Sequence, residues 1–474
     1  MSSNWDQYET PLTQWYQKNG PLLKLFSERS KIENWRQLWI WLAEAEQELE
    51  ISQITDEMIA TMKANKSIID KEFILAERGR LKNEVLAQKS AFGKVLCPQA
   101  AGIISLSATS SFVQDNWELI RQKQALDLLI EQYLTVMEIV ARFSEQQAKT
   151  LTVGRTHWQT ASLMTAGKRS VHWLQELLMV FKKLINFRAN MRFLGIKSTL
   201  GNQDSILELF NKDDNKVQQL DALITEKAGF KSQFHITDQS YPRQQDAELL
   251  FILSQFGAAS DKICKDIRFL QSQNELVESC AEDQNGNTPM SYKRNPMKAE
   301  KVCALSRKLI LDVFEGLMAS ADQGVKRPYD DSASCRVHIP DAFLCMAAVL
   351  SILQTIFEGL RIHESLEQKV NNELPFLALE KATTLLTIGE GVDLQSLHAK
   401  IRKISQQAKI MQEHGDGITL EEILSDSLFN KVRIDVIAMA SEPINFAGTC
   451  IRQVNEFLKD EYRPVVEPFL KSFL

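Results

Sequence analysis

Five long segments in the middle of the chain repeat their apolar residues every three to four positions, and this repeat constrains the fold more than any other feature. Apolar residues of the first segment mark one buried helical face: Leu126, Leu129, Ile130, Tyr133, Val136, Met137 and Val140. The other four segments cover about 161–187, 247–270, 297–318 and 340–362. We therefore expect five long helices, separated by polar loops and packed as an elongated bundle.

The remaining sequence also favours helices. Nothing alternates with period two for long enough to predict a strand, and only 19 glycines and 12 prolines interrupt 474 residues. The predicted fold class is therefore all-α. The chain is too long for one core, so we predict an N-terminal helical domain (1–111), the central bundle (112–364) and a C-terminal helical cap (365–474), the outer two built of shorter helices. Apolar residues on the third and fifth helices exceed what one bundle hides, which predicts an oligomer.

Composition excludes several classes of protein. The net charge is −6 and acidic and basic residues are interspersed, which argues against a nucleic-acid-binding surface. Seven cysteines without a closely spaced pair predict reduced thiols in a soluble, cytoplasmic protein. The N-terminus lacks the pattern of a signal peptide. The most apolar stretch, 343–357, is short and interrupted by polar residues, so it predicts a core helix and no membrane partner. We expect neither a metal nor a cofactor.

The loop between the third and fourth segments carries the most specific motif. It reads GNTPMSYKRNP at 286–296, and it resembles the fumarase/aspartase signature G-S-S-x-M-P-x-K-x-N-P at Gly286, Met290, Lys293, Asn295 and Pro296. With MKAE directly after it, the loop is similar to the version in adenylosuccinate lyases. The resemblance extends over nearly the whole chain through WRQLW at 35–39, GRTH at 154–157 and PINF at 443–446. A plain turn punctuated by glycine and proline would explain the loop, but not the other matches.

The resemblance implies a fold, an assembly and a reaction. The fold is a helical subunit of a homotetramer with twenty central helices, in which each active site takes loops, including the signature loop at 284–296, from three subunits. The reaction is a β-elimination that releases fumarate from adenylosuccinate, giving AMP, and from the succinylated carboxamide intermediate of purine synthesis. It needs no cofactor, but it requires a base, an acid and cations that hold the carboxylates.

Three residues match the family's catalytic groups. His157, in a polar loop ahead of the second helix, matches the acid, and histidine suits this role because its pKa lies near working pH. Glu300 matches the carboxylate that orients the histidine, and it would also suit the first turn of a helix, where the dipole stabilises an acid. Lys293, together with Asn295, matches the residues that hold the substrate carboxylates.

The remaining matched residues would contact other parts of the substrate. Thr109, Ser110, Thr156 and Gln203 match polar contacts to the succinyl group. The phosphate cluster is matched by Arg327, Ser332 and Arg336, because two guanidinium groups and a hydroxyl suit a phosphate dianion. Tyr16 matches a phosphate contact near the N-terminus, and Lys82 stands in the pocket where the family has arginine.

The general-base position departs from the family pattern. The family's base is the serine after the signature glycine, whereas this chain has Asn287, whose carboxamide is not basic enough to take a proton from carbon. Thr288 offers a hydroxyl one residue along, roughly 3.5 Å away, and Ser291 offers another. Other matched pocket positions also differ, namely Trp15, Asn83, Gln88 and Ser107.

These departures leave three interpretations open. In the first, the chain is a lyase with a relocated base, acting on adenylosuccinate or another fumarate adduct. In the second, it is a non-catalytic paralogue that binds nucleotide or joins a sister lyase in a mixed tetramer. In the third, it is a purely structural helical protein. Turnover of adenylosuccinate distinguishes the first interpretation from the other two.

Overall fold

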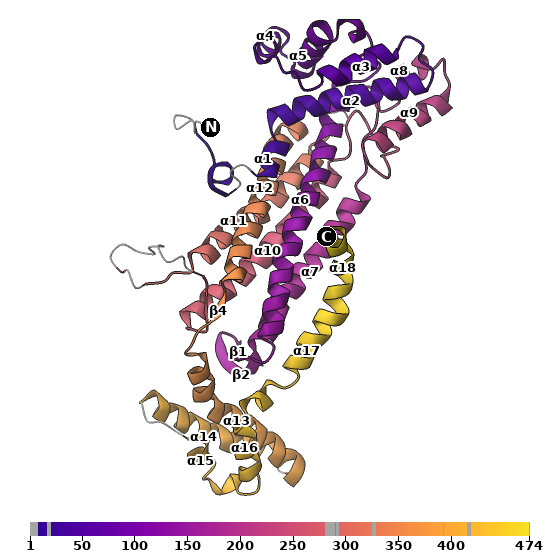
Figure 1. Cartoon of the computed structure of the whole chain (residues 1–474). Coiled ribbons are helices and arrows are strands. Elements are labelled where there is room, and N and C mark those ends of the chain that lie inside the picture. The colour runs from indigo at the N-terminus through magenta and orange to yellow at the C-terminus, as the bar shows by residue number, and fades with distance from the viewer. Residues whose placement is uncertain are drawn as a thin grey trace. The chain divides into compact units, whose positions relative to one another are not determined.

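The structure, a computed structural model, describes residues 8–16, 20–279, 290, 293–324, 329–391, 393–414 and 419–473. Helices dominate these residues and confirm the all-α prediction (Figure 1). The helices are α1 (Pro21–Leu25), α2 (Glu28–Glu48), α3 (Asp56–Asn65), α4 (Lys71–Leu81), α5 (Glu84–Ser90), α6 (Ser110–Gln146), α7 (Ala166–Asn190), α8 (Asp204–Leu209), α9 (Asp214–Lys227), α10 (Gln244–Ser272), α11 (Met297–Ala321), α12 (Tyr329–Glu358), α13 (Leu366–Glu390), α14 (Leu394–Glu413), α15 (Leu420–Ile423), α16 (Arg433–Ala440), α17 (Cys450–Glu456) and α18 (Arg463–Phe473). Short irregular helices are η1 (Leu12–Tyr16), η2 (Ala91–Leu96), η3 (Pro98–Ala100), η4 (Ser427–Phe429), η5 (Pro443–Ala447) and η6 (Phe457–Tyr462).

The five predicted long helices are α6, α7, α10, α11 and α12, and α6 is the longest at 37 residues. By its contacts the chain forms two compact units, and each of the five long helices continues from one unit into the other. Unit 1 comprises Met1–Tyr133, Val180–Ala258 and Ala304–Ser351, and unit 2 comprises Leu134–Met179, Ala259–Cys303 and Ile352–Leu474. The division into three domains at 111/112 and 364/365 stays a prediction.

In unit 1, a buried arginine joins two of the N-terminal helices. Nη1 of Arg36, on α2, donates to the carbonyl oxygens of Asn65, Lys66 and Ile68 at 3.3, 2.9 and 2.5 Å. The last carbonyls of a helix have no partner within the helix, so this guanidinium closes the end of α3. Burial lowers the pKa of Arg36 to about 10, which leaves it charged at neutral pH.

In unit 2, the C-terminal helices share a core with the strands described next. Apolar residues of α13, α14, α15 and α16 form one cluster, which includes Ala378, Leu397, Leu424 and Val436. The expectation of shorter helices after residue 364 was wrong for α13, which at 25 residues is as long as α7 and α11, whereas α14 has 20. Pro375 lies inside α13 without ending the helix.

The expectation of no strands was also wrong. Strand β1 (Leu151–Thr156) pairs antiparallel with β2 (Gln159–Thr165), and β3 (Leu276–Val277) pairs antiparallel with β4 (Arg361–Ile362). The second long helix therefore begins at Ala166 and not near 161, because β2 takes those residues. The fifth ends at Glu358, before β4, and begins at Tyr329, well ahead of Pro340.

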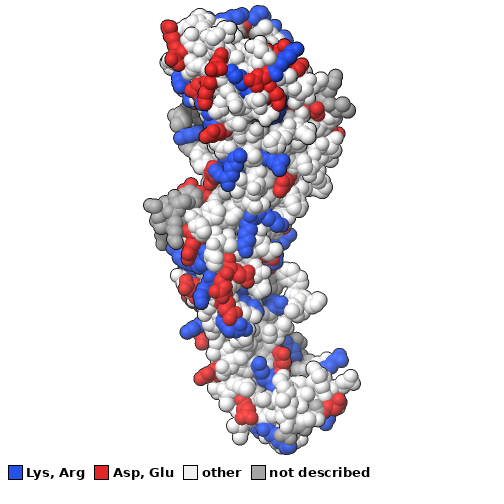
Figure 2. All heavy atoms as spheres, turned by 90° about the vertical axis from the view of Figure 1, so that its right-hand side faces the viewer, with Lys and Arg blue, Asp and Glu red and all other residues white. Residues whose placement is uncertain are grey.

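Helix α12 is the most apolar of the long helices. Within the part of the chain that the structure covers, its Ser332–Glu358 segment alone is long and apolar enough to cross a membrane, judged by length and composition. Of its most apolar window, 67% is buried inside the protein, as the core-helix prediction requires. Acidic and basic side chains are interspersed over the face shown in Figure 2.

Candidate active site

The predicted polar loop that carries His157 is the tip of the β1–β2 hairpin. The last paired residues are Thr156 and Gln159, so His157 and Trp158 form a two-residue turn. Both have positive φ, +51° and +64°, as a type I′ turn requires. Asparagine and glycine usually occupy such turns, since other residues rarely adopt this backbone conformation. The exposed His157 is thus presented outward by a strained turn.

A bulge in the hairpin explains why the GRTH motif begins with glycine. The pairing shifts between Val153 and Arg155, and Gly154 lies at this irregularity. A Cβ on Gly154 would lie 2.6 Å from the carbonyl oxygen of Ser162 on the facing strand. Only glycine permits this close approach of the two strands.

A buried carboxylate anchors the base of the hairpin. Glu275 is fully buried and accepts hydrogen bonds from Oγ1 of Thr152 at 3.0 Å and from Arg155, and Arg169 of α7 lies 3.5 Å from its other oxygen. Arg169 also donates to the carbonyl oxygen of Val153 at 2.7 Å. Burial lowers the pKa of Arg169, and the charge of Glu275 opposes that shift. Two cations and one carboxylate therefore hold β1 in place.

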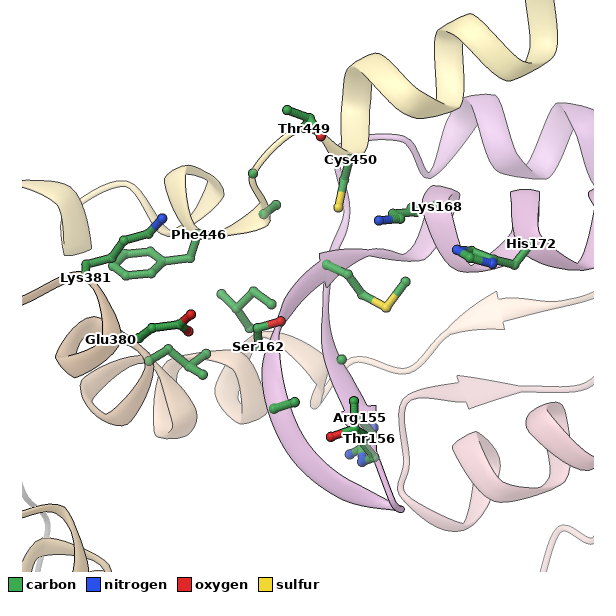
Figure 3. A pocket seen from close by; sticks show the side chains of 17 residues that line it. Arg155, Thr156, Ser162, Lys168, His172, Glu380, Lys381, Phe446, Thr449 and Cys450 are labelled. Atoms are coloured by element: carbon green, nitrogen blue, oxygen red, sulfur yellow. The ribbon is translucent and has the colours of Figure 1, made fainter. Parts of the chain in front are cut away.

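Two cavities of unit 2 adjoin the hairpin. His157 and Trp158 line one of about 320 Å³, together with Arg169, Asp266 and Phe269. The second, of about 460 Å³, has a polar lining, shown in Figure 3, that includes Arg155, Thr156, Ser162, Lys168, His172, Glu380, Lys381, Thr449 and Cys450. Thr156 and His157, adjacent in sequence, thus line different cavities, and Arg155 lines both.

The described end of the signature loop leads directly into α11. The side chain of Lys293 is exposed and that of Asn295 is half-buried. Glu300 lies in the first turn of α11, as predicted. The carboxylate of Glu278 accepts the backbone N–H groups of Lys298 and Ala299 at 2.9 and 3.0 Å, and so caps this helix.

Two catalytic candidates of this loop, Asn287 and Thr288, lie outside the described residues, as do Ser291 and, in the phosphate cluster, Arg327. Among the described contacts, none joins His157 to Glu300. Within the described part of one chain, the carboxylate of Glu300 therefore does not contact His157, and its predicted role in orienting the histidine stays a prediction.

In unit 1, two predicted substrate-binding loops meet. The hydroxyl of Ser107 donates to the carbonyl oxygen of Ser205 at 3.4 Å, and the hydroxyl of Ser205 donates to the carbonyl oxygen of Ser107 at the same distance. Ser107 precedes Thr109 and Ser110, and Ser205 follows Gln203 by two residues. The structure therefore brings together the loops that carry these three candidates.

Gln203 is itself fixed at the start of α8. It has positive φ (+55°), and its Nε2 donates to the carbonyl oxygen of Ile196 at 2.8 Å. Glycine at 201 allows this loop to form, because a Cβ there would lie 1.8 Å from the carbonyl oxygen of Thr237. The amide of Gln203 is thus held by the backbone of its own unit.

The other candidates of unit 1 lie on separate elements. Tyr16 ends η1, and Lys82 follows α4 with positive φ (+51°) and an exposed side chain. Ser332 is buried and Arg336 exposed one turn later on α12. Thr156, His157, Lys293, Asn295 and Glu300 belong to unit 2. The candidates therefore divide into two sets by unit.

Sequence reasoning missed the residues that support His157. Glu275, Arg169 and Phe269 match no motif, and a lone Glu after an amphipathic helix is usually a solvated residue. The pairing of residues 151–156 with 159–165 would have been the signal, but it was hidden because the turn lacks the Asn-Gly or Asp-Gly pair typical of tight hairpins.

Comparisons with known proteins relate the chain to lyases. A family model described as "Lyase" matches residues 18–311. The chain is 48% identical over 466 residues to adenylosuccinate lyase of Caenorhabditis briggsae, covering 98% of this chain and 97% of that protein. It is 35% identical to adenylosuccinate lyase of Saccharomyces cerevisiae, covering 99% and 97% of the two chains.

Solved structures share the fold at lower identity. A fumarate lyase from Mesorhizobium sp. BNC1 superposes with a TM-score of 0.77 at 17% identity, covering 93% of this chain and 97% of that one. A 3-carboxy-cis,cis-muconate lactonizing enzyme from Pseudomonas putida gives 0.79 at 18% identity, covering 94% and 98%. At these identities the likeness shows the fold alone.

Proposed function

The chain belongs to the adenylosuccinate lyase family, and from this membership we propose that it cleaves adenylosuccinate into AMP and fumarate. It is a C–N lyase with the fold of the fumarase/aspartase superfamily. Members of the adenylosuccinate lyase family act on small nucleotide substrates. The observation that carries the proposal is a relationship spanning nearly the full length of both chains, hairpin and signature loop included. The succinylated carboxamide intermediate of purine synthesis is the second proposed substrate.

His157 is the proposed acid. A base removes a proton from the carbon beside a succinyl carboxylate, the bond from the succinyl group to the purine nitrogen breaks, and His157 protonates that nitrogen. The exposed position of His157 supports this role, because the ring is free to approach a substrate. Lys293 and Asn295 are proposed to hold the succinyl carboxylates, with Glu300 orienting a histidine of the assembled site.

The base is the least ordinary part of the proposal. Asn287 cannot take the proton, so we assign the base to a hydroxyl nearby in the same loop, first Thr288 and then Ser291. A hydroxyl group, the type of side chain that the family uses as base, is therefore present within four residues of the family position.

A spectrophotometric assay with adenylosuccinate tests the function. We expect the purified protein to turn over, and Thr288→Ala to lower kcat by at least about 100-fold. A Ser291→Ala variant is the matched comparison, and loss of activity there alone would move the base to Ser291. If the unmodified protein is inactive and the Asn287→Ser variant is active, the relocated base is contradicted. If the unmodified protein and the Asn287→Ser variant are both inactive, the proposed function is contradicted.

A homotetramer is the proposed assembly, with each site drawn from several copies. An apolar stripe on α11 supports it, because its members recur on one helical face and are at least half exposed: Leu311, Phe314, Leu317 and Met318. Phe251 of α10 is a further exposed aromatic residue of the same unit. Exposed apolar patches of this kind mark interfaces between proteins.

We also propose a cytosolic location. Five of the cysteines that the structure describes, Cys97, Cys264, Cys303, Cys345 and Cys450, are free and buried. Free thiols are typical of the reducing cytosol.

A further inference from the structure

The turn that carries His157 requires support from outside itself. Left-handed backbone conformations are unfavourable for L-residues, and both His157 and Trp158 adopt them. The His157 ring makes no hydrogen bond to another described residue. No hydrogen bond to a described residue therefore holds the His157 ring in place.

Trp158 is exposed over two-thirds of its surface, yet its ring is not free. The ring meets that of Phe269 on α10 edge to face, with centroids 4.9 Å apart and an interplanar angle of 67°. This is a geometry that aromatic pairs prefer, and such a pair stabilises the fold beyond the area that it buries. We call Trp158 and Phe269 the aromatic brace.

The brace is connected to the buried anchor of the hairpin. The Arg155 guanidinium lies 5.4 Å from the centroid of Phe269, within cation–π range, and also bonds to Glu275. Glu275 in turn holds Thr152 of β1. The turn is thus linked by contacts on both sides to α10 and to a fully buried carboxylate.

We propose that Trp158 is a positioning residue, which fixes the His157 ring for proton transfer by bracing the turn against Phe269. This inference rests on the proposed function, in which His157 is the acid. Proton transfer requires the ring within hydrogen-bond reach of the leaving nitrogen, and a displacement of about 1 Å can lower the rate ~100-fold. The brace supplies the restraint that the ring itself lacks.

Steady-state kinetics test the consequence for catalysis. Trp158→Ala should lower kcat about 10- to 100-fold and leave KM within about threefold, because substrate binding uses other residues. Trp158→Phe keeps an edge-to-face ring and should restore most of kcat. Ile388→Ala removes another exposed apolar side chain of the same unit and serves as the control with unchanged kinetics. A Trp158→Ala enzyme with the kcat of the unmodified protein would overturn the proposal.

Hydrogen–deuterium exchange tests the brace independently of activity. Amides of residues 151–165 should exchange faster in Trp158→Ala and in Phe269→Leu than in the unmodified protein. The double variant should exchange no faster than either single variant, since each change removes the same contact. Unchanged exchange in all three variants would overturn the proposal. An unmodified protein that does not cleave adenylosuccinate would contradict the proposed function, while the exchange data would still decide the brace.

Discussion

Glu46, on α2 of unit 1, is fully buried, and neither of its oxygens has a hydrogen-bond partner among the described residues. Burial raises its pKa to about 9, because a charge without a partner is costly inside a protein. The folded protein therefore keeps this carboxyl protonated at neutral pH, whereas the unfolded chain releases the proton.

Stability should consequently fall as pH rises between the two pKa values of Glu46, 4.5 unfolded and about 9 folded. In this window the unfolded state binds fewer protons, so the stabilisation present below it is lost at about 1.4 kcal/mol per pH unit. Glu46→Gln removes the titration and should raise the thermal midpoint more at about pH 8 than at about pH 6. The exposed Glu48→Gln on the same helix is the control, and an equal shift at both pH values would contradict the prediction.

Substitution of two glycines of unit 1 distinguishes the destabilisation caused by backbone strain from that caused by a steric clash. Gly201 and Gly229 have nearly the same φ, +74° and +75°, but a Cβ clashes with Thr237 only at Gly201 and meets nothing within 4 Å at Gly229. Gly229→Ala should destabilise by about 1–2 kcal/mol. Gly201→Ala should cost roughly 3 kcal/mol or more and also raise KM, because it displaces the loop of Gln203. Thermal midpoints and KM check this, and equal effects of the two changes would refute it.

At this scale the sequence suggested chemical roles for individual residues but not the surroundings of those residues. His157, Lys293 and Glu300 could be proposed because they stand in motifs. The conformation of His157 could not, since its turn lacks the residues typical of tight hairpins. The support from Glu275 could not either, since it arises from contacts between segments far apart in the sequence.

Helix α11 owes its start to a residue that precedes the signature loop. The Glu278 carboxylate accepts two of its first N–H groups, although burial raises the pKa of this group. Glu278→Ala should therefore destabilise by about 1–2 kcal/mol and lower kcat, because Glu300 lies in the same turn. Glu278→Gln keeps one acceptor and should be milder in both respects. Identical thermal midpoints and kcat for the two variants would show that the cap is unimportant.

The five long helices could be predicted because their apolar periodicity extends over many turns. The hairpin could not, since β1 and β2 are short and their turn is His-Trp. Helix α12 begins well before its predicted start at Pro340. Proline usually marks the end of a helix, but here it lies inside one.

At the scale of the whole molecule, the apolar stripe of α11 predicts how assembly affects activity. Phe314→Glu places a charge in the stripe, which should shift the protein to smaller species in analytical ultracentrifugation. Because the proposed sites draw on several copies, kcat should fall at least about 10-fold in parallel. The exposed Ile434→Glu on α16 provides a charge-matched control. Full activity in a monomeric variant would contradict shared sites.

The burial of α12 also bears on how the chain is made. Its Cys345 donates to the carbonyl oxygen of Leu305 on α11 at 3.4 Å, and its Phe343 ring lies 5.8 Å from that of Phe26. Both covering residues precede α12 in the sequence. A ribosome releases the chain from its N-terminus, so these partners have left the exit tunnel before α12 emerges. The order of the helices thereby shortens the time during which the most membrane-like segment of a nascent chain is without cover.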